Sequence, residues 1–148
     1  LRLNPSGPFH SSRLRFHSDD LLIPDPFFPG DPEPTINPDK ITLYEMHLCP
    51  FCQRVRYTLD YHEIPYDRIL ISVGSKPSWY LQMNPKGKVP LLMHHGLKMI
   101  DSEVIMKYVD QLKDAENSLL SVCGEEGFQK ALDMSSSVSL LIFPILPL

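Results

Sequence analysis

Hydrophobic and polar positions change their pattern along the chain, and the change is sharpest at Lys40. Before it, prolines recur from Pro5 to Pro38, and each proline fixes φ and removes a backbone donor. After it, short β-branched and apolar runs alternate with stretches whose apolar residues repeat every three or four positions. The pattern predicts an extended or disordered, flexible arm over residues 1–40 and an ordered domain from residue 41 onward.

Seven elements are predicted within the ordered region. The predicted strands are 41–46, 66–72, 89–94 and 97–100, and the predicted helices are 51–62, 78–83 and 102–113. Ser78 and Ser102 are the expected N-caps of the last two helices, and the last two strands form a hairpin around His95-Gly96. The order β-α-β-α-β-β-α predicts an α/β fold in which the first two strands are parallel, the hairpin is an antiparallel edge, and helices cover both faces.

The pattern is weaker toward the C-terminus. Residues 125–134 could begin another helix, whereas residues 135–148 combine serines and apolar residues without amphipathic spacing. The apolar tail 138–148 is too short to span a bilayer and is broken by Pro144 and Pro147. We therefore expect no transmembrane segment.

Composition and charge narrow the class of protein. With 148 residues, of which 43% are hydrophobic and 22% charged, the chain suits one ordinary globular domain. A net charge of −4 offers no basic surface for nucleic acid. Three cysteines do not make a disulfide framework, so we expect a reducing, cytoplasmic location. The arginines and serines of residues 1–18 would also suit a transit peptide, or translation from upstream of the true start.

The candidate chemistry lies in Cys49-Pro50-Phe51-Cys52. A nucleophilic cysteine must be a thiolate, and a free thiol with a pKa of about 8.5 is mostly protonated at neutral pH. Cys49 is predicted directly before a helix that begins at Pro50, where unpaired N–H groups and the helix dipole stabilise an anion. We therefore predict that Cys49 is a partly exposed nucleophile. Cys52, one turn later, could act as a resolving thiol or pack inward.

The C-x-x-C motif allows other interpretations. It could be half of a zinc site with His47 as a third ligand, but no second pair of ligands follows, and we expect no metal. Haem attachment would require His where the chain has Gln53. An inert, packed cysteine pair remains an alternative, because thiols without an electropositive setting are unreactive. The distant Cys123 is expected to be a small buried side chain.

Four motifs follow one another along the chain. They are Cys49-Pro50-Phe51 with Gln53-Arg54, Lys76-Pro77-x-Trp79-Tyr80, Asn84-Pro85-x-Gly87-x-Val89-Pro90, and Asp101-Ser102. With them, residues 43–111 resemble the N-terminal, thioredoxin-like domain of the omega-class glutathione transferases. The resemblance implies a thioredoxin-like βαβαββα glutathione-binding domain over residues 41–113. It also implies that residues 114–148 are the truncated start of the all-α second domain of these enzymes.

The resemblance further implies roles for individual residues. Val89-Pro90 would form a cis-proline turn and leave the Val89 backbone to pair with the cysteinyl part of glutathione. Asp101 would accept from the γ-glutamyl ammonium, while Ser102 and the helix N-terminus would bind the γ-glutamyl carboxylate. Lys76 would pair with the glycyl carboxylate, and Phe51 would contact the tripeptide beside the thiol.

These roles predict a thiol transferase or dehydroascorbate reductase with glutathione as cosubstrate. Cys49 would attack a small oxidised or electrophilic substrate and become glutathionylated, and a homodimer is expected only of a full-length chain. Two departures from the omega pattern are Cys52, where many members have a small residue, and Asp101, where glutamate is usual. The alternatives are a glutaredoxin-like relative, a non-catalytic relative of the chloride intracellular channel proteins, which share C-P-F-x-Q-R, and an inactive truncated product.

Overall fold

The computed structural model describes residues 24–113 and 115–142, with side chains as far as residue 136. The first part of the predicted arm and the end of the apolar tail lie outside the described residues. The elements are β1 (Ile41–Glu45), α1 (Pro50–Tyr61), β2 (Tyr66–Leu70), α2 (Ser78–Met83), β3 (Leu91–His94), β4 (Leu97–Ile100), α3 (Ser102–Gln111), the 3-10 helix η2 (Ala115–Asn117) and α4 (Leu119–Ile142). The predicted order of strands and helices up to α3 is confirmed, with ends that differ by one or two residues.

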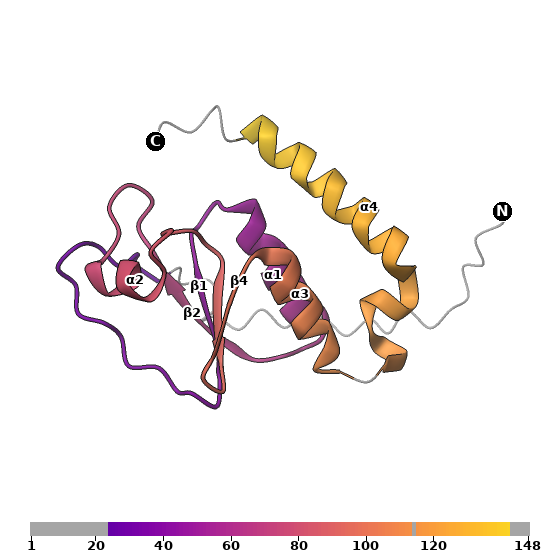
Figure 1. Ribbon diagram of the computed structural model, residues 1–148, viewed down its shortest axis with the longest axis horizontal. Coiled ribbons are helices and arrows are strands. Elements are labelled where there is room, and N and C mark those ends of the chain that lie inside the picture. The colour runs from indigo at the N-terminus through magenta and orange to yellow at the C-terminus, as the bar shows by residue number, and fades with distance from the viewer. Residues whose placement is uncertain (1–23, 114, 143–148) are drawn as a thin grey trace.

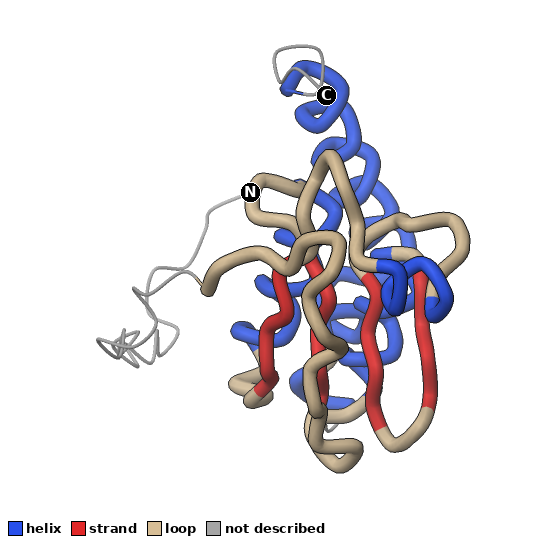
Figure 2. Tube along the Cα trace, turned by 90° about the vertical axis from the view of Figure 1, so that its left-hand side faces the viewer, coloured by secondary structure: helices blue, strands red, loops and turns tan. Residues whose placement is uncertain are grey.

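The four strands form one mixed sheet in the order β2-β1-β3-β4. Strand β1 is parallel to β2, with Ile41 opposite Tyr66, and antiparallel to β3, with Tyr44 opposite Leu91. Strands β3 and β4 form the predicted antiparallel hairpin. Figure 2 shows the strands side by side, with α1, α3 and α4 behind them. The thioredoxin-like βαβαββα fold is confirmed.

Because successive side chains of a strand point to opposite faces, the central strand β1 contributes to two cores. Ile41 and Leu43 pack with residues of α1 and α3, whereas Tyr44 packs with Trp79 and Tyr80 of α2. Figure 1 shows α1 and α3 on one side of the sheet and α2 on the other. Helices therefore cover both faces, as predicted.

The predicted N-caps were wrong by one residue in both helices. Helix α2 begins after Pro77, without a side-chain cap, and Ser78 is its first helical residue. Helix α3 is capped by Asp101, whose carboxylate accepts a hydrogen bond from the Glu103 N–H at 2.9 Å. Aspartate is as good a cap as serine, and the pattern of side chains does not show which of two adjacent residues leaves the helical backbone conformation.

The buried face of α3 is narrow. Ile105 and Val109 are fully buried against the sheet and α1, but Val104 is 53% exposed and Leu112 is 40% exposed. Tyr108 is partly buried and its hydroxyl lies 2.7 Å from His94 Nδ1. The helix therefore buries a stripe of Ile105 and Val109, flanked by Tyr108.

The proline-rich arm is attached to the domain over its described part, residues 24–40. Phe27 forms a parallel bridge with Ile71 and packs edge-on against Trp79, with ring centroids 5.7 Å apart. The Trp79 Nε1–H donates to the Asp31 carbonyl at 3.0 Å. This part of the arm packs on the domain through Phe27 and Asp31. The boundary at residue 40 stays a prediction.

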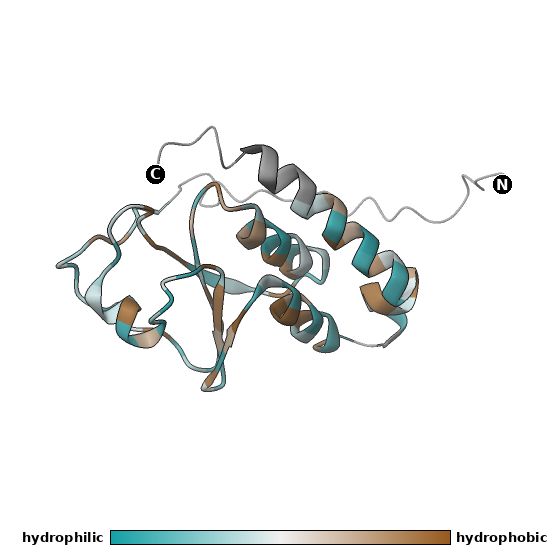
Figure 3. Cartoon of the chain, turned by 45° about the horizontal axis from the view of Figure 1, so that its top comes forward, coloured by the Kyte–Doolittle hydropathy of each residue, from teal (hydrophilic) through white to brown (hydrophobic). Residues whose placement is uncertain are grey.

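Helix α4 extends beyond the predicted segment 125–134. It runs to Ile142 and is interrupted at Gly124, whose φ of 69° is not helical. Within this helix the Ser135 and Ser136 hydroxyls donate to the Leu132 carbonyl at 2.9 Å each, so they bond to the helix backbone. Figure 3 shows hydrophilic and hydrophobic positions alternating along the described side chains of α4. No helix within residues 24–113 and 115–142 combines the length and hydrophobicity needed to cross a membrane.

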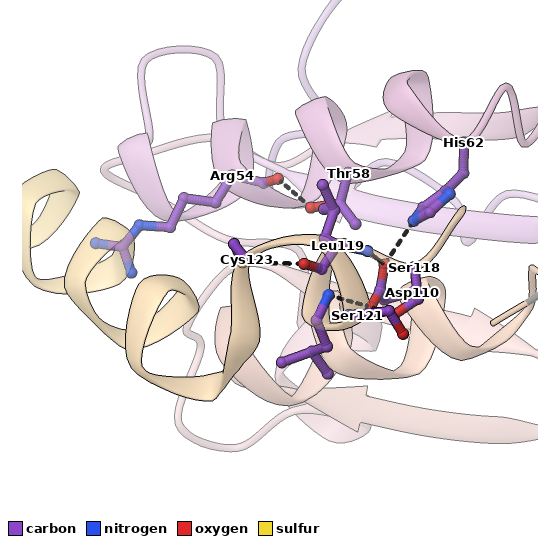
Figure 4. Close-up of polar contacts among 9 residues, drawn as sticks. Arg54, Thr58, His62, Asp110, Ser118, Leu119, Ser121 and Cys123 are labelled. Carbon is purple, nitrogen blue, oxygen red and sulfur yellow. Dashed lines mark hydrogen bonds and ion pairs between the residues drawn. The ribbon is translucent and has the colours of Figure 1, made fainter. Parts of the chain in front are cut away.

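A buried polar cluster, the Asp110 junction, joins α1, α3 and the start of α4. The Asp110 carboxylate accepts hydrogen bonds from the His62 side chain, the Ser118 hydroxyl, and the Leu119 and Leu120 N–H groups. Figure 4 shows His62 pointing from α1 toward Asp110, with Ser118 and Leu119 beside it. Asp110 thereby caps the N-terminus of α4, where a negative charge is favourable.

Candidate active site

Cys49 lies at the start of α1, between β1 and the first helical residue. It is the N-cap residue, with φ −80° and ψ 115°, and Pro50 follows as the first residue of the helix. The Cys49 carbonyl accepts the Gln53 N–H at 3.0 Å, and the Cys49 N–H donates to the Met46 carbonyl at 3.2 Å. The predicted placement of this thiol at a helix N-terminus is confirmed.

The pKa of the Cys49 thiol is lowered to about 7. The main cause is a hydrogen bond from the Cys52 thiol, opposed by burial and assisted by the N–H groups of Cys52 and Phe51. The same interaction and burial raise the pKa of Cys52, which therefore stays protonated and acts as the donor. Both thiols are free, so the pair consists of one ionisable thiol and one thiol that stabilises it.

The predicted partial exposure of Cys49 was wrong, because the residue is only 2% exposed. Its thiol accepts a hydrogen bond from the thiol of the fully buried Cys52.

A buried carboxylate lies at the end of β1, close enough to affect both thiols. Glu45 is fully buried and pairs with Arg68 through Oε1 and with Arg56 through Oε2, the latter at 3.2 Å. Its negative charge raises the pKa of both Cys49 and Cys52. Glu45 therefore disfavours ionisation of the Cys49 thiol. Its ion pairs with Arg56 and Arg68 partly neutralise its charge and so reduce this effect.

Next to the thiol pair lies a cleft of about 350 Å³. It is lined by Phe51, Asn84, Lys86, Lys88, Val89, Pro90, Ile100, Asp101 and Ser102. It thus gathers the predicted residues Phe51, Val89, Pro90, Asp101 and Ser102 from three of the four motifs. Cys49, Cys52 and Lys76 do not line its wall, although Phe51 connects the cleft to the start of α1.

The loop before β3 forms one wall of the cleft. The Val89-Pro90 peptide bond is cis, as the resemblance implied. The Lys88 carbonyl accepts from the Tyr80 hydroxyl and from Asn84 Nδ2, both at 2.7 Å. In the described part of the chain, no hydrogen bond uses the Val89 backbone. An extended peptide could therefore pair with it, as a strand pairs with a sheet edge.

The opposite wall is the start of α3. Asp101 has a φ of 85°, a conformation uncommon for a residue with a Cβ and often found at functional sites. Its Oδ1 accepts from the Glu103 N–H, which leaves Oδ2 available. Ser102 is buried at 7% exposure, and its hydroxyl has no hydrogen-bond partner among the described residues. This wall offers a hydroxyl, a carboxylate oxygen and a helix N-terminus.

Lys76 is not among the residues that line the cleft, and its pairing with the glycyl carboxylate stays a prediction. Its Nζ donates to the Val73 carbonyl at 3.1 Å. Its aliphatic chain lies so close to Gly87 that a Cβ added there would come within 3.2 Å of Lys76 Cδ. Lys86 and Lys88 do line the cleft, but they were not predicted as site residues. They are the two unspecified positions on either side of Gly87 in the third motif.

Arg54 belongs to the first of the four motifs, but its contacts were not predicted from the sequence. Its guanidinium lies over the Phe51 ring, 4.9 Å from the centroid. Its Nη2 donates to the Leu132 carbonyl at 3.2 Å and to the Ser136 hydroxyl at 2.8 Å, both on α4. Arg54 therefore connects the cleft wall to α4, across a separation in sequence that no local pattern reveals.

A second cavity of about 370 Å³ lies between α1 and α4. Its lining is mainly apolar and includes Tyr57, Met106, Leu119, Phe128 and Leu132. Cys123 also borders it and is exposed, so the prediction that Cys123 is buried was wrong. The Cys123 thiol donates to the Leu119 carbonyl at 2.9 Å, one helical turn earlier, which holds it at the surface of α4.

Among the described residues, no three His, Cys, Asp or Glu side chains are arranged to hold a metal ion. His47, considered above as a third ligand for the cysteine pair, is exposed. The site is therefore described by its thiols, its cleft and the charges around them.

Together, the sheet, the thiol at the N-terminus of α1 and the cis-proline loop define a thioredoxin-like thiol domain. Residues 43–117 match the family described as "Glutathione S-transferase, N-terminal domain". The chain belongs to the glutathione S-transferase family.

Several characterised proteins are similar to this chain. Pyrimidodiazepine synthase of Drosophila melanogaster is 50% identical over 87 residues, which cover 55% of this chain and 36% of that protein. Glutathione S-transferase DHAR2 of Arabidopsis thaliana is 43% identical over 63 residues, which cover 43% of this chain and 30% of that protein. Glutathione S-transferase omega-1 of Sus scrofa is 33% identical over 104 residues, which cover 69% of this chain and 43% of that protein. The chain thus spans about a third of the length of these relatives.

Among solved structures, glutathione transferase Omega 1C from Trametes versicolor is similar, with 31% identity and a TM-score of 0.48. The match covers 51% of this chain and 37% of that one.

Proposed function

We propose that this chain binds glutathione in the cleft beside Cys49 and acts as an omega-type thiol transferase or dehydroascorbate reductase. The observation that carries the proposal is a thiol with a pKa lowered to about 7, at a helix N-terminus beside a cleft with complementary groups. The similarity to omega-1 and DHAR2 transferases supports the same activity.

Glutathione would be held at both walls of the cleft. The Val89 backbone is free to pair with the cysteinyl residue, which would direct the glutathione sulfur toward α1. The Ser102 hydroxyl and the start of α3 suit the γ-glutamyl carboxylate, and Asp101 Oδ2 suits its ammonium. Phe51 would pack against the bound tripeptide.

The reaction would begin with attack of the Cys49 thiolate on the glutathione sulfur of a mixed disulfide. A Cys49–glutathione disulfide forms as the old S–S bond breaks, and the other thiolate leaves and takes a proton from water. The thiolate of a second glutathione then attacks the glutathione sulfur, so that oxidised glutathione leaves and the Cys49 thiolate returns. With dehydroascorbate, the Cys49 thiolate would add to a carbonyl carbon and form a thiohemiketal. The thiolate of one glutathione would then attack the Cys49 sulfur and break its C–S bond, so that ascorbate leaves with the electron pair and the Cys49–glutathione disulfide forms. A second glutathione would reduce that disulfide as above.

The raised pKa of Cys52 favours a monothiol route. A resolving thiol must lose its proton before it attacks, and burial, the Cys49 thiolate and Glu45 all oppose this for Cys52. We therefore assign Cys52 the role of hydrogen-bond donor to the thiolate. C52S should retain most turnover, whereas a large loss would indicate the glutaredoxin-like, dithiol alternative.

The decisive test compares C49S with C123S in a glutathione-dependent assay with hydroxyethyl disulfide and with dehydroascorbate. C49S should fall to the rate measured without protein, while C123S should match the parent because Cys123 lies on the surface of α4. Full activity in C49S would refute the proposal. Inactivity of the parent with both substrates would favour a non-catalytic relative.

We also propose the division of the chain that the sequence suggested. Residues 41–113 would be the glutathione-binding unit, and the segment from residue 114, with α4, would begin a helical unit. A cytoplasmic location would keep both thiols reduced, and one rice relative is named as a cytosolic protein.

A further inference from the structure

The direction of the Val89 N–H, which a bound peptide would use, is set by the residue before it. This N–H and the Lys88 carbonyl belong to one trans peptide unit, since the cis bond of the loop follows Val89. A trans peptide unit is planar, so its N–H and its carbonyl point in opposite directions. A hydrogen bond that fixes the Lys88 carbonyl therefore also fixes the direction of the Val89 N–H.

Two buried side chains hold that carbonyl. The Tyr80 hydroxyl and Asn84 Nδ2 both donate to the Lys88 oxygen at 2.7 Å. Tyr80 is fully buried and Asn84 is 2% exposed. A carbonyl oxygen has two lone pairs, and each donor takes one of them. Rotation of this peptide plane would break both hydrogen bonds and leave two buried donors unsatisfied, which is costly.

The two donors are themselves held by the surrounding structure. The Tyr80 ring packs against Tyr44 of β1 and against Trp79, with ring centroids 5.9 Å and 6.0 Å apart. Burial raises the pKa of the Tyr80 hydroxyl to about 12, so the hydroxyl stays protonated and donates at neutral pH. The Asn84 N–H donates to the Tyr80 carbonyl at 2.7 Å, and the Asn84 carbonyl accepts from the Gly87 N–H at 2.8 Å. The loop is therefore fixed relative to the sheet.

The position of Val89 connects these contacts to the ligand. Val89 and Asn84 line the cleft, whereas Tyr80 does not. We propose that Tyr80 and Asn84 are positioning residues for glutathione, because they direct the Val89 N–H toward the cysteinyl carbonyl of the bound tripeptide. Tyr80 has this effect without touching the ligand. The inference rests on the proposed function, since it names the residues that prepare the cleft for glutathione.

The test is calorimetric titration of the full chain, kept reduced with a phosphine, with glutathione and with γ-glutamylcysteinyl-glycolate. In this ester an oxygen replaces the glycyl N–H, which makes the cysteinyl carbonyl a weaker acceptor and keeps every charge. The variants are Y80F and Y80F/N84A. The matched control is Y66F/N37A, which removes a hydroxyl and a side-chain amide outside the cleft. Circular dichroism sets a temperature at which every protein is folded.

Y80F should bind glutathione about two- to tenfold more weakly than the parent, as expected for one lost neutral hydrogen bond. The loss in Y80F/N84A should be about tenfold or more, because the apparent affinity falls with the fraction of molecules in the competent conformation. A role confined to stability would lower the midpoint of urea unfolding but would leave the affinity of the folded protein unchanged.

The ester shows whether the Val89 N–H is the group that is positioned. The parent should prefer glutathione over the ester about two- to tenfold, and Y80F/N84A should prefer it about twofold or less, because a misdirected N–H does not distinguish the two carbonyls. Y66F/N37A should match the parent with both ligands.

Two results would overturn the inference while leaving the proposed function intact. The first is a Y80F protein that binds glutathione as tightly as the control does. The second is a preference for glutathione over the ester that is absent in the parent or unchanged in Y80F/N84A. If Y80F/N84A does not fold, the same two comparisons are made between Y80F and Y66F. A parent that binds neither ligand would overturn the proposed function, and this inference with it.

Discussion

Replacement of Asp110 by asparagine tests the Asp110 junction with almost no change in shape. Oδ1 accepts from His62 Nε2 and the Leu119 N–H, both at 2.7 Å. Oδ2 accepts from the Ser118 hydroxyl at 2.6 Å and from the Leu120 N–H at 3.1 Å. The amide of asparagine keeps one acceptor oxygen and replaces the other with an NH₂ group, which can only donate.

In either orientation that NH₂ group faces one of the two backbone N–H groups. The Ser118 hydroxyl can rotate and His62 can change tautomer, but a backbone N–H of Leu119 or Leu120 cannot become an acceptor. The variant therefore loses one charge-assisted hydrogen bond, worth about 1.5–3 kcal/mol, and a favourable charge at a helix N-terminus, worth about 0.3–1 kcal/mol. We expect D110N to lower the free energy of unfolding by about 2–4 kcal/mol.

The measurement is urea unfolding, followed by circular dichroism and by the fluorescence of Trp79, the single tryptophan. D67N is the matched control, because Asp67 makes an exposed ion pair with Lys40 at 2.7 Å. Such a pair contributes about 0–1 kcal/mol. If D110N lost no more stability than D67N, the carboxylate would not hold the junction together and the reasoning would fail.

The same variant has a pH signature. Burial alone would raise the pKa of Asp110, but the hydrogen bonds from Ser118, Leu119, Leu120 and His62 lower it below its ordinary value of 3.8. A carboxyl with a lowered folded-state pKa contributes stability that is present above the unfolded-state pKa and is lost as the pH falls through the folded-state value. The parent should therefore lose stability below about pH 4, and D110N should lack this part of the acid dependence.

Two further predictions concern the thiol and its connection to α4. The rate of Cys49 alkylation by iodoacetamide should rise with pH with a midpoint near 7, because the thiolate is the reactive form. C52A should raise that midpoint because it removes the donor, C52S should largely preserve it, and an unchanged midpoint in C52A would contradict the assignment. R54Q should accelerate amide hydrogen exchange in α4 but not in the sheet, because the hydrogen bonds to Leu132 and Ser136 are lost. R54K should not restore protection from exchange, since an ammonium lacks the planar fork of the guanidinium. Unchanged exchange in R54Q would show that the hydrogen bonds from Arg54 do not hold α4 in place.

The sequence predicted those parts of the fold that depend on local pattern. The β-branched run of β1 and the three- and four-residue spacing of α1 identify their elements, and Cys49-Pro50 marks the join between them. The four motifs also located most of the cleft, since Phe51, Val89, Pro90, Asp101 and Ser102 all line it.

The predictions that failed depend on atoms distant in sequence or on backbone angles. The Asp101 cap was missed because Asp101 and Ser102 are equally good N-cap residues by side-chain type, and only their φ and ψ angles show which one caps the helix. The burial of Cys49 depends on its contact with Cys52, which spacing does not specify. Asp110 is an acid inside a predicted amphipathic helix, and its partner His62 is 48 residues away.

Polar contacts hold α4 near its two described ends, and this arrangement explains the second cavity. Asp110 binds the first turn of the helix, while Arg54 binds Leu132 and Ser136 near the last described side chains. Between these anchors the lining is mainly apolar, and about 370 Å³ stays unfilled. The apolar packing between α1 and α4 is therefore incomplete, and the position of α4 depends on the two anchors. Because Arg54 also contacts Phe51, a displacement of α4 would act directly on the wall of the cleft beside the thiol pair.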